Sequence, residues 1–274
     1  MTDEIRNGAK STAETSLVPP AAETAENVQD CAPADAVRRT WLGEYAELLA
    51  KWLPVLFWVM VINMVRSGLK STFKLPEKIP AAGQVLDAAS YACTLVQICV
   101  FWRLRKAERG FRTLAVIHTV TLAVTLAALA VLGTLDPVAA AHALSQSKHA
   151  LALSGGLLAA VMGLAVAVTY IETTAYSSVS RYADEGLAGK WRGLRGWLVG
   201  MSSALLVTSV MLVLCAGDPF LFLNGWTTFL LLLMAAATIG MAVCNIVSLV
   251  YLYQTMTRFK SAAQELKDQQ EEGT

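Results

Sequence analysis

Residues 186–200 read GLAGKWRGLRGWLVG, and this stretch governs how the chain is expected to pack. Its glycines recur every three or four residues, which on an α-helix places them on one side. Each glycine inside a helix costs about 1 kcal/mol relative to alanine, so several in register are expected only where a neighbouring backbone approaches closely. This glycine seam therefore predicts a partner helix, and its members are Gly186, Gly189, Gly193, Gly196 and Gly200.

The side of the same helix opposite the seam carries large apolar residues at helical spacing, with Lys190, Arg192 and Arg195 between or beside the two faces. Three structures fit this pattern. The stretch can form a glycine-rich loop, a helix lying against anionic headgroups, or a helix that continues into the next apolar run. We expect the continuous or slightly bent helix, with the seam facing the preceding helix. The large apolar residues are Leu187, Trp191, Leu194 and Leu198.

Apolar residues make up 55% of the 274-residue chain and charged residues only 16%, more apolar sequence than a soluble domain of this size needs. An 18-residue helix is about 27 Å long, close to the thickness of the hydrocarbon core of a bilayer. The sequence therefore predicts an all-α, polytopic bundle of six transmembrane helices. The first run is short and must borrow flanking residues, and the sixth is longer than needed. The apolar runs are 52–65, 85–102, 114–132, 151–170, 198–215 and 226–252.

Lysine and arginine concentrate in the connections after the second and fourth runs, which the positive-inside rule places in the cytoplasm. With six spans, both termini are then cytoplasmic. The expected location is a plasma membrane, and the absence of Asn-x-Ser/Thr sites favours a bacterial inner membrane. One connection disagrees with this topology, because it is basic and falls outside: it holds Arg66, Lys70, Lys74 and Lys78.

The predicted domains are a disordered cytoplasmic tail (1–38), a six-helix transmembrane domain (39–258) and a polar cytoplasmic tail (259–274). No basic tract with interleaved aromatic residues suggests nucleic-acid binding. The five cysteines form no CxxC pair and are interpreted as packing residues.

Small residues also recur in the fourth and sixth runs, where Gly156, Gly163 and Gly240 belong to further close-packing rows. We expect the fourth helix to be central and to pair with the fifth. Small residues in such rows allow membrane helices to approach backbone to backbone.

Four polar residues within or beside the spans are candidate functional residues. Asp87 is expected to cap the second helix or stabilise its N-terminus, and His118 is expected to bond to a neighbouring helix. Glu172 is expected to pair with Arg103 or Arg105 at the membrane border, although it and Asn245 could also serve a functional site. Asp136, His142 and His149 are possible zinc ligands in one outer loop, but they lack the tight spacing of a zinc site, so a zinc site is not expected.

The sequence contains no HExxH, GxSxG or Walker motif, so we expect neither an enzyme nor a bound cofactor or metal. Two function classes remain open. One is a permease-like or substrate-binding membrane subunit that needs a separate energising partner, which the basic cytoplasmic connections could dock. The other is a non-transport membrane protein for assembly, regulation or sensing. The sequence predicts contact with the lipid bilayer. It does not determine the oligomeric state or the ligand.

Overall fold

The structure is a computed structural model, which describes residues 34–71, 80–132, 150–216 and 225–272. Within these residues the chain is helical apart from short connections, and each of six helices is long and apolar enough to cross a membrane. The expected all-helical fold with six helices of membrane-spanning length is confirmed. The helices are α1 (Ala34–Ser71), α3 (Pro80–Leu104), α4 (Arg109–Leu132), α6 (Ala150–Ala183), α7 (Glu185–Ala216) and α9 (Trp226–Glu272).

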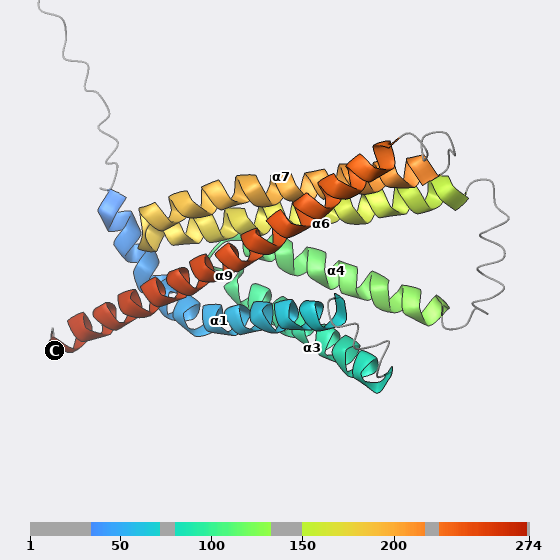
Figure 1. The fold of residues 1–274 in the computed structure, drawn as a ribbon. Coiled ribbons are helices and arrows are strands. Elements are labelled where there is room, and N and C mark those ends of the chain that lie inside the picture. The colour runs from blue at the N-terminus through green and yellow to red at the C-terminus, as the bar shows by residue number, and fades with distance from the viewer. Residues whose placement is uncertain (1–33, 72–79, 133–149, 217–224, 273–274) are drawn as a thin grey trace, which may run out of the picture.

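The helices run up and down, so that α1 begins and α9 ends at the same end of the bundle (Figure 1). The α3–α4 and α6–α7 connections lie at this end too, and we call it the basic end for its lysines and arginines. At the other end, α3 and α4 diverge from α6 and α7 in Figure 1. Basic residues near the basic end include Arg38, Arg103, Arg105, Lys106, Arg181, Lys190 and Arg258.

The helix α6 packs along α7 as an antiparallel hairpin, and it also touches α4, α9 and α1. The predicted pairing of the fourth and fifth helices is confirmed. The remaining contacts join α7 to α9, α9 to α1, α1 to α3 and α3 to α4. Much of the fully buried side-chain volume lies towards the basic end, in a core whose largest members are Trp191, Tyr176, Phe101, Phe111, Phe259, Leu49 and Leu53.

The first and last helices are longer than their apolar runs. α1 begins at Ala34, contains Pro54 and is bent in Figure 1, as expected where proline removes a backbone hydrogen bond. α9 continues through the predicted tail to Glu272, and Lys267 near its end lies 3.1 Å from Glu47 of α1. Residues 1–33 of the predicted N-terminal tail lie outside the described residues.

The stretch 186–200 belongs to one continuous helix, α7, as expected. Asp184 caps the start of α7, because its Oδ1 accepts the backbone N–H of Leu187 at 3.1 Å. Within the described residues, contrary to the prediction, no partner helix packs against the glycine seam. A Cβ placed on Gly189, Gly193, Gly196 or Gly200 would meet no described atom within 4 Å, and one on Gly186 would meet only the side chain of Asp184.

The seam faces outward because α7 can turn only one face toward α6 and α9. That face carries the large residues Leu187, Trp191, Leu194 and Leu198, all less than 7% exposed. Large side chains make far more van der Waals contacts than glycine, and contact of this kind drives helix association in lipid. The small-residue rows of α6 also lack the predicted close contact, because Gly156 and Gly163 face open space.

Close approach does occur at two other glycines. Gly240 of α9 lies against the side chain of Met201 of α7, whose Cε would be 2.9 Å from an added Cβ, so the neighbour there is a flexible side chain rather than a backbone. Gly110 of α4 lies against Ala175 of α6, where the two Cβ atoms would be only 2.8 Å apart. Gly110 is therefore the glycine at which two helices approach most closely, and it was not among the predicted seam residues.

Candidate functional site

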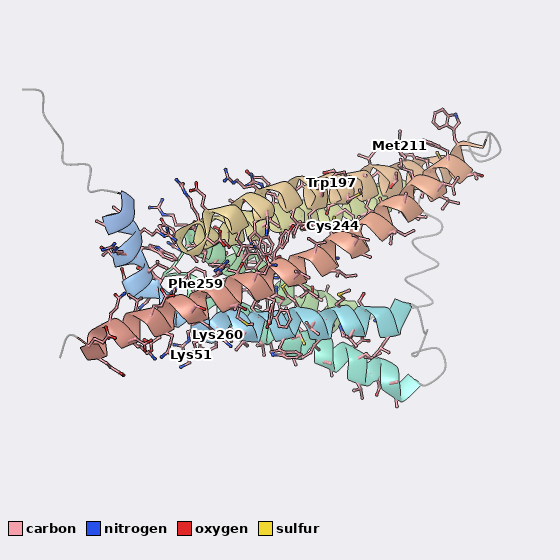
Figure 2. All side chains as sticks on the ribbon, turned by 60° about the vertical axis from the view of Figure 1, so that its left-hand side comes forward. Lys51, Trp197, Met211, Cys244, Phe259 and Lys260 are labelled. Carbon is pink, nitrogen blue, oxygen red and sulfur yellow. The ribbon has the colours of Figure 1, made fainter. Side chains whose placement is uncertain are left out.

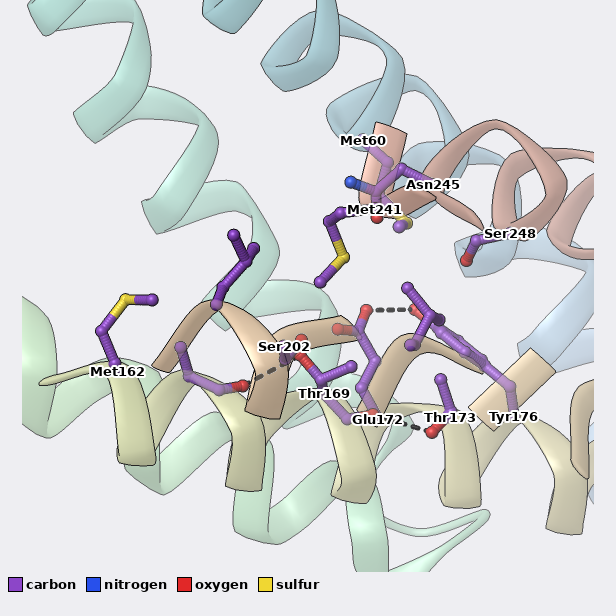
Figure 3. A pocket seen from close by; sticks show the side chains of 13 residues that line it. Met60, Met162, Thr169, Glu172, Thr173, Tyr176, Ser202, Met241, Asn245 and Ser248 are labelled. Carbon is purple, nitrogen blue, oxygen red and sulfur yellow. Dashed lines mark hydrogen bonds between the residues drawn. The ribbon is translucent and has the colours of Figure 1, made fainter. Parts of the chain in front are cut away.

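Glu172 points from α6 into the interior of the bundle (Figure 3). The hydroxyl of Tyr176, one turn later on α6, donates a hydrogen bond to Glu172 Oε1 at 3.0 Å. Glu172 lies eleven residues before the end of α6 at Ala183, which is about 16 Å along the helix axis. The carboxyl group is thus held well inside the bundle, away from the basic end.

Two adjoining cavities meet at Glu172, with volumes of about 310 and 600 Å³. We call them together the Glu172 cavity. Their sizes match the range of small-molecule sites in proteins. The residues that line both cavities are Met60, Glu172, Leu205, Met241 and Asn245, contributed by α1, α6, α7 and α9.

Polar side chains line much of the cavity wall. The smaller part is bordered by hydroxyl groups on α6, α7 and α9, from Thr169, Thr173, Ser202 and Ser248 (Figure 3). The larger part is bordered by three side-chain amides, from Asn63, Gln97 and Asn245. None of these amides hydrogen-bonds to another residue of the described chain. An amide inside a membrane bundle is costly without a hydrogen-bond partner. These three side chains are therefore expected to bond to a ligand or to water.

A row of aromatic rings separates the Glu172 cavity from the basic end. Successive ring centroids are 4.8 to 6.0 Å apart, close enough for direct contact. The rings come from α3, α4, α6, α7 and α9, so one layer ties five helices together. In order they are Phe101, Phe111, Tyr176, Trp191 and Tyr251.

Buried hydrogen bonds fix this aromatic layer. Trp191 Nε1 donates to the hydroxyl of Thr255 on α9 at 3.1 Å, and the hydroxyl of Ser180 lies 3.2 Å from the same oxygen. Ser177 donates to the backbone carbonyl of Ala188 at 3.1 Å. These contacts set the relative positions of α6, α7 and α9, and therefore the position of Tyr176 beside Glu172.

The expected pairing of Glu172 with Arg103 or Arg105 is wrong. Arg103 lies over the ring of Trp52 at 5.9 Å, and Arg105 lies over the ring of Trp102 at 5.1 Å. Both arginines sit at the end of α3, whereas Glu172 is directed into the cavity. The partner of Glu172 is a residue of its own helix, Tyr176.

The expected role of Asp87 also needs correction. α3 begins at Pro80, so Asp87 lies beyond its first turn and does not cap it. The carboxylate instead pairs with Lys70 of α1 at 2.8 Å, and both side chains are about half exposed, at 52% and 50%. This pair links the last turn of α1 to α3, two residues beyond Gly68, which lines the larger part of the cavity.

Of the remaining candidate residues, His118 lies outside the cavity lining and Asn245 belongs to it. His118 stacks on Phe101 of α3 at 5.6 Å, but its Nε2 has no hydrogen-bond partner among the described residues, contrary to the expected bond. Asn245 lines both parts of the cavity beside Glu172. The described residues contain no group of three potential metal ligands, and Asp136, His142 and His149 lie outside them.

Tyr176 and the hydroxyl groups around Glu172 are not among the candidate residues predicted from the sequence. The signal was available, because Thr169, Glu172, Thr173 and Tyr176 recur every three or four residues and so share one helix face. A polar face in the middle of an apolar helix indicates either a cavity or polar contacts with a neighbouring helix.

Comparison of the chain with protein-family models, with curated proteins and with solved structures finds no match.

Proposed function

We propose that this chain is a permease-like or substrate-binding membrane subunit that holds a small polar ligand in the Glu172 cavity. The observation that carries the proposal is the cavity itself, in which one carboxyl group and three side-chain amides meet inside a bundle of apolar helices. Ionisable residues in membrane helices are costly, and those that face an interior cavity typically mark a ligand site or a substrate path. No chemical step is proposed, so the role is binding.

The chemistry of the lining favours a ligand that donates hydrogen bonds, such as a protonated amine. An ionised Glu172 accepts hydrogen bonds only, and it has a second oxygen beyond the one bonded to Tyr176. The amides Asn63, Gln97 and Asn245 add both donors and acceptors. Met60 and Met241 contribute flexible apolar surface that adapts to the remainder of the ligand.

Access to the cavity is proposed from the end opposite the basic end. Ser67 and Gly68, which lie in the last turns of α1, line the larger part of the cavity. The aromatic layer closes the other side. The positive-inside rule supports placing the basic end in the cytoplasm of a bacterial cell, so the cavity would face outward in this conformation. The basic connections are then positioned to dock an energising partner.

The competing class, a non-transport protein for assembly or regulation, rested on seams of small residues as packing devices. A Cβ added to seven of its eight seam glycines, all except Gly240, would meet no described atom of another helix within 4 Å. That class therefore has less support than the ligand-binding class.

Cysteine accessibility tests the proposal without knowledge of the ligand. In a background in which the native cysteines are replaced by alanine, Asn245→Cys is treated in intact membranes with a hydrophilic maleimide. The adjacent position, Ile246→Cys, is the matched control, because Ile246 is 49% exposed on the bundle surface outside the cavity. A thiol in contact with water ionises and reacts, whereas a thiol in lipid does not.

The proposal predicts rapid labelling at position 245 and little at 246. Equal protection of both positions would mean that the cavity holds no water, and the ligand-binding role would then be abandoned. Mass spectrometry after purification in mild detergent tests the energising partner separately: recovery of an ATPase supports it, and a clean homo-oligomer counts against it.

A further inference from the structure

We infer that the outer face between α7 and α9 is a binding site for one anionic phospholipid. This site is separate from the Glu172 cavity, and the inference depends only on the chain spanning a membrane. It rests on two adjoining hollows, of about 590 and 370 Å³, whose linings share Lys190 of α7. One hollow is apolar and the other is polar.

The apolar hollow runs between one stripe of α7 and one stripe of α9, and we call it the α7–α9 groove. Figure 2 marks its two walls with Trp197 on α7 and Cys244 on α9. Gly193 leaves room along the groove because it has no side chain and faces open space, and Trp197 is 65% exposed at the groove's edge. The outward-facing glycine at position 193 thus contributes to a hollow rather than to a helix contact.

The length of the groove fits one leaflet of a bilayer. Its α9 wall extends from Gly240 to Tyr251, twelve residues whose ends are about 16 Å apart. Its α7 wall extends over the same number of residues, from Lys190 to Met201. Half of a typical hydrocarbon core is about 15 Å thick, so an acyl chain can follow the groove from the interface to the bilayer centre.

The polar hollow lies at the basic end of the groove, where a headgroup would sit. Its wall includes hydroxyl groups, Gln254 and two cations, Lys190 and Arg258. Asp184 also lines it, but its carboxylate lies 3.4 Å from Arg258 and accepts the N–H of Leu187. Lys190 has no ion-pair or hydrogen-bond partner in the part of the chain that the structure describes. The hollow therefore carries one net positive charge, which complements a singly charged phosphodiester.

The charge and the shape together favour a phospholipid over a protein helix or a free anion. A helix from a partner would need a wide apolar face, and a free phosphate would gain nothing from the groove. A basic residue near a membrane surface contributes roughly 1 kcal/mol to the binding of an anionic lipid, which is about a fivefold preference.

Native mass spectrometry of delipidated protein, titrated with phosphatidylglycerol or phosphatidylcholine of matched chains, tests the inference. Wild type is expected to bind phosphatidylglycerol about fivefold more tightly. Lys190→Gln should remove this preference, while Lys260→Gln, an exposed cation of α9 outside both hollows, should retain it.

A second pair of variants tests the groove. Gly193→Leu places a side chain in the groove and should weaken binding of phosphatidylglycerol at least fivefold. Gly189→Leu is the matched control on the same helix, since it also faces open space but lines neither hollow. Both variants are first checked for wild-type thermal stability, and a leucine in a helix is favourable in either position.

Three results would each overturn the site: equal binding of the two lipids, no difference between Gly193→Leu and Gly189→Leu, or displacement of phosphatidylglycerol by millimolar inorganic phosphate. A mass spectrum dominated by dimers that Gly193→Leu disrupts would assign the groove to a second copy of the chain instead.

Discussion

Glu172 and Tyr176 lie one turn apart on α6, and the hydroxyl of Tyr176 donates a hydrogen bond to the carboxyl group at 3.0 Å. The same tyrosine ring packs against Trp191 of α7, with centroids 4.8 Å apart. The carboxyl group is therefore oriented by a side chain that the α6–α7 contact itself holds in place. Packing of the α6–α7 hairpin and orientation of the Glu172 carboxyl group are therefore linked through Tyr176.

A double-mutant cycle measures the coupling between these two residues. Tyr176→Phe, Glu172→Gln and the double variant are compared by unfolding in mixed micelles. Hydrogen bonds between membrane helices contribute about 0.6 kcal/mol on average, and we expect a coupling energy of at most about that size for this pair within one helix. Additive effects of the two single substitutions would show that the hydrogen bond contributes nothing to the fold.

Substitution by alanine should have opposite effects on the free energy of unfolding at Gly110 and at Gly189. Gly110→Ala places a Cβ 2.8 Å from that of Ala175, and overpacking of this kind costs about 1–3 kcal/mol. Gly189→Ala meets no described atom and should stabilise α7 by up to about 1 kcal/mol. Thermal unfolding in detergent checks both, and a stabilised Gly110→Ala variant would contradict the close approach of α4 and α6.

Trp191 and Trp197 form another matched pair, six residues apart on α7. Trp191 is fully buried and donates to Thr255, whereas Trp197 is 65% exposed. Trp191→Phe should cost about 1–3 kcal/mol, because it removes a buried hydrogen bond and part of a packed ring. Trp197→Phe should change the free energy of unfolding by less than about 0.5 kcal/mol. Equal losses in the two variants would mean that α7 is rotated relative to the structure.

The helices are predictable because the apolar runs that form them are long and nearly free of charge. The rotation of each helix about its own axis is not predictable from those runs. α7 has two periodic faces, one of glycines and one that contains Trp191. Periodicity identifies both faces, but which one turns inward depends on the contacts that α6 and α9 offer, including Thr255. The seam was therefore assigned to the wrong side of a correctly predicted helix.

The site shows the same limit. Glu172 was identified from its position in an apolar run, yet its expected partners Arg103 and Arg105 were chosen by proximity to the membrane border. Only the arrangement of α1, α6, α7 and α9 brings Asn245 next to Glu172. Asp87 was misassigned because its apolar run begins at Val85, whereas α3 starts earlier at Pro80, where proline suits a first helical turn.

The central claim is that the carboxylate of Glu172 faces a water-filled cavity, and charge selectivity at position 245 tests it most directly. Asn245→Cys is modified by a cationic and by an anionic thiosulfonate reagent, and each rate is divided by that for a free thiol in solution. An opposite charge a few ångströms away contributes about 1 kcal/mol or more, so the cationic reagent should be favoured at least fivefold. Adding Glu172→Gln should return the ratio to about one. A ratio unchanged by that substitution would contradict the account.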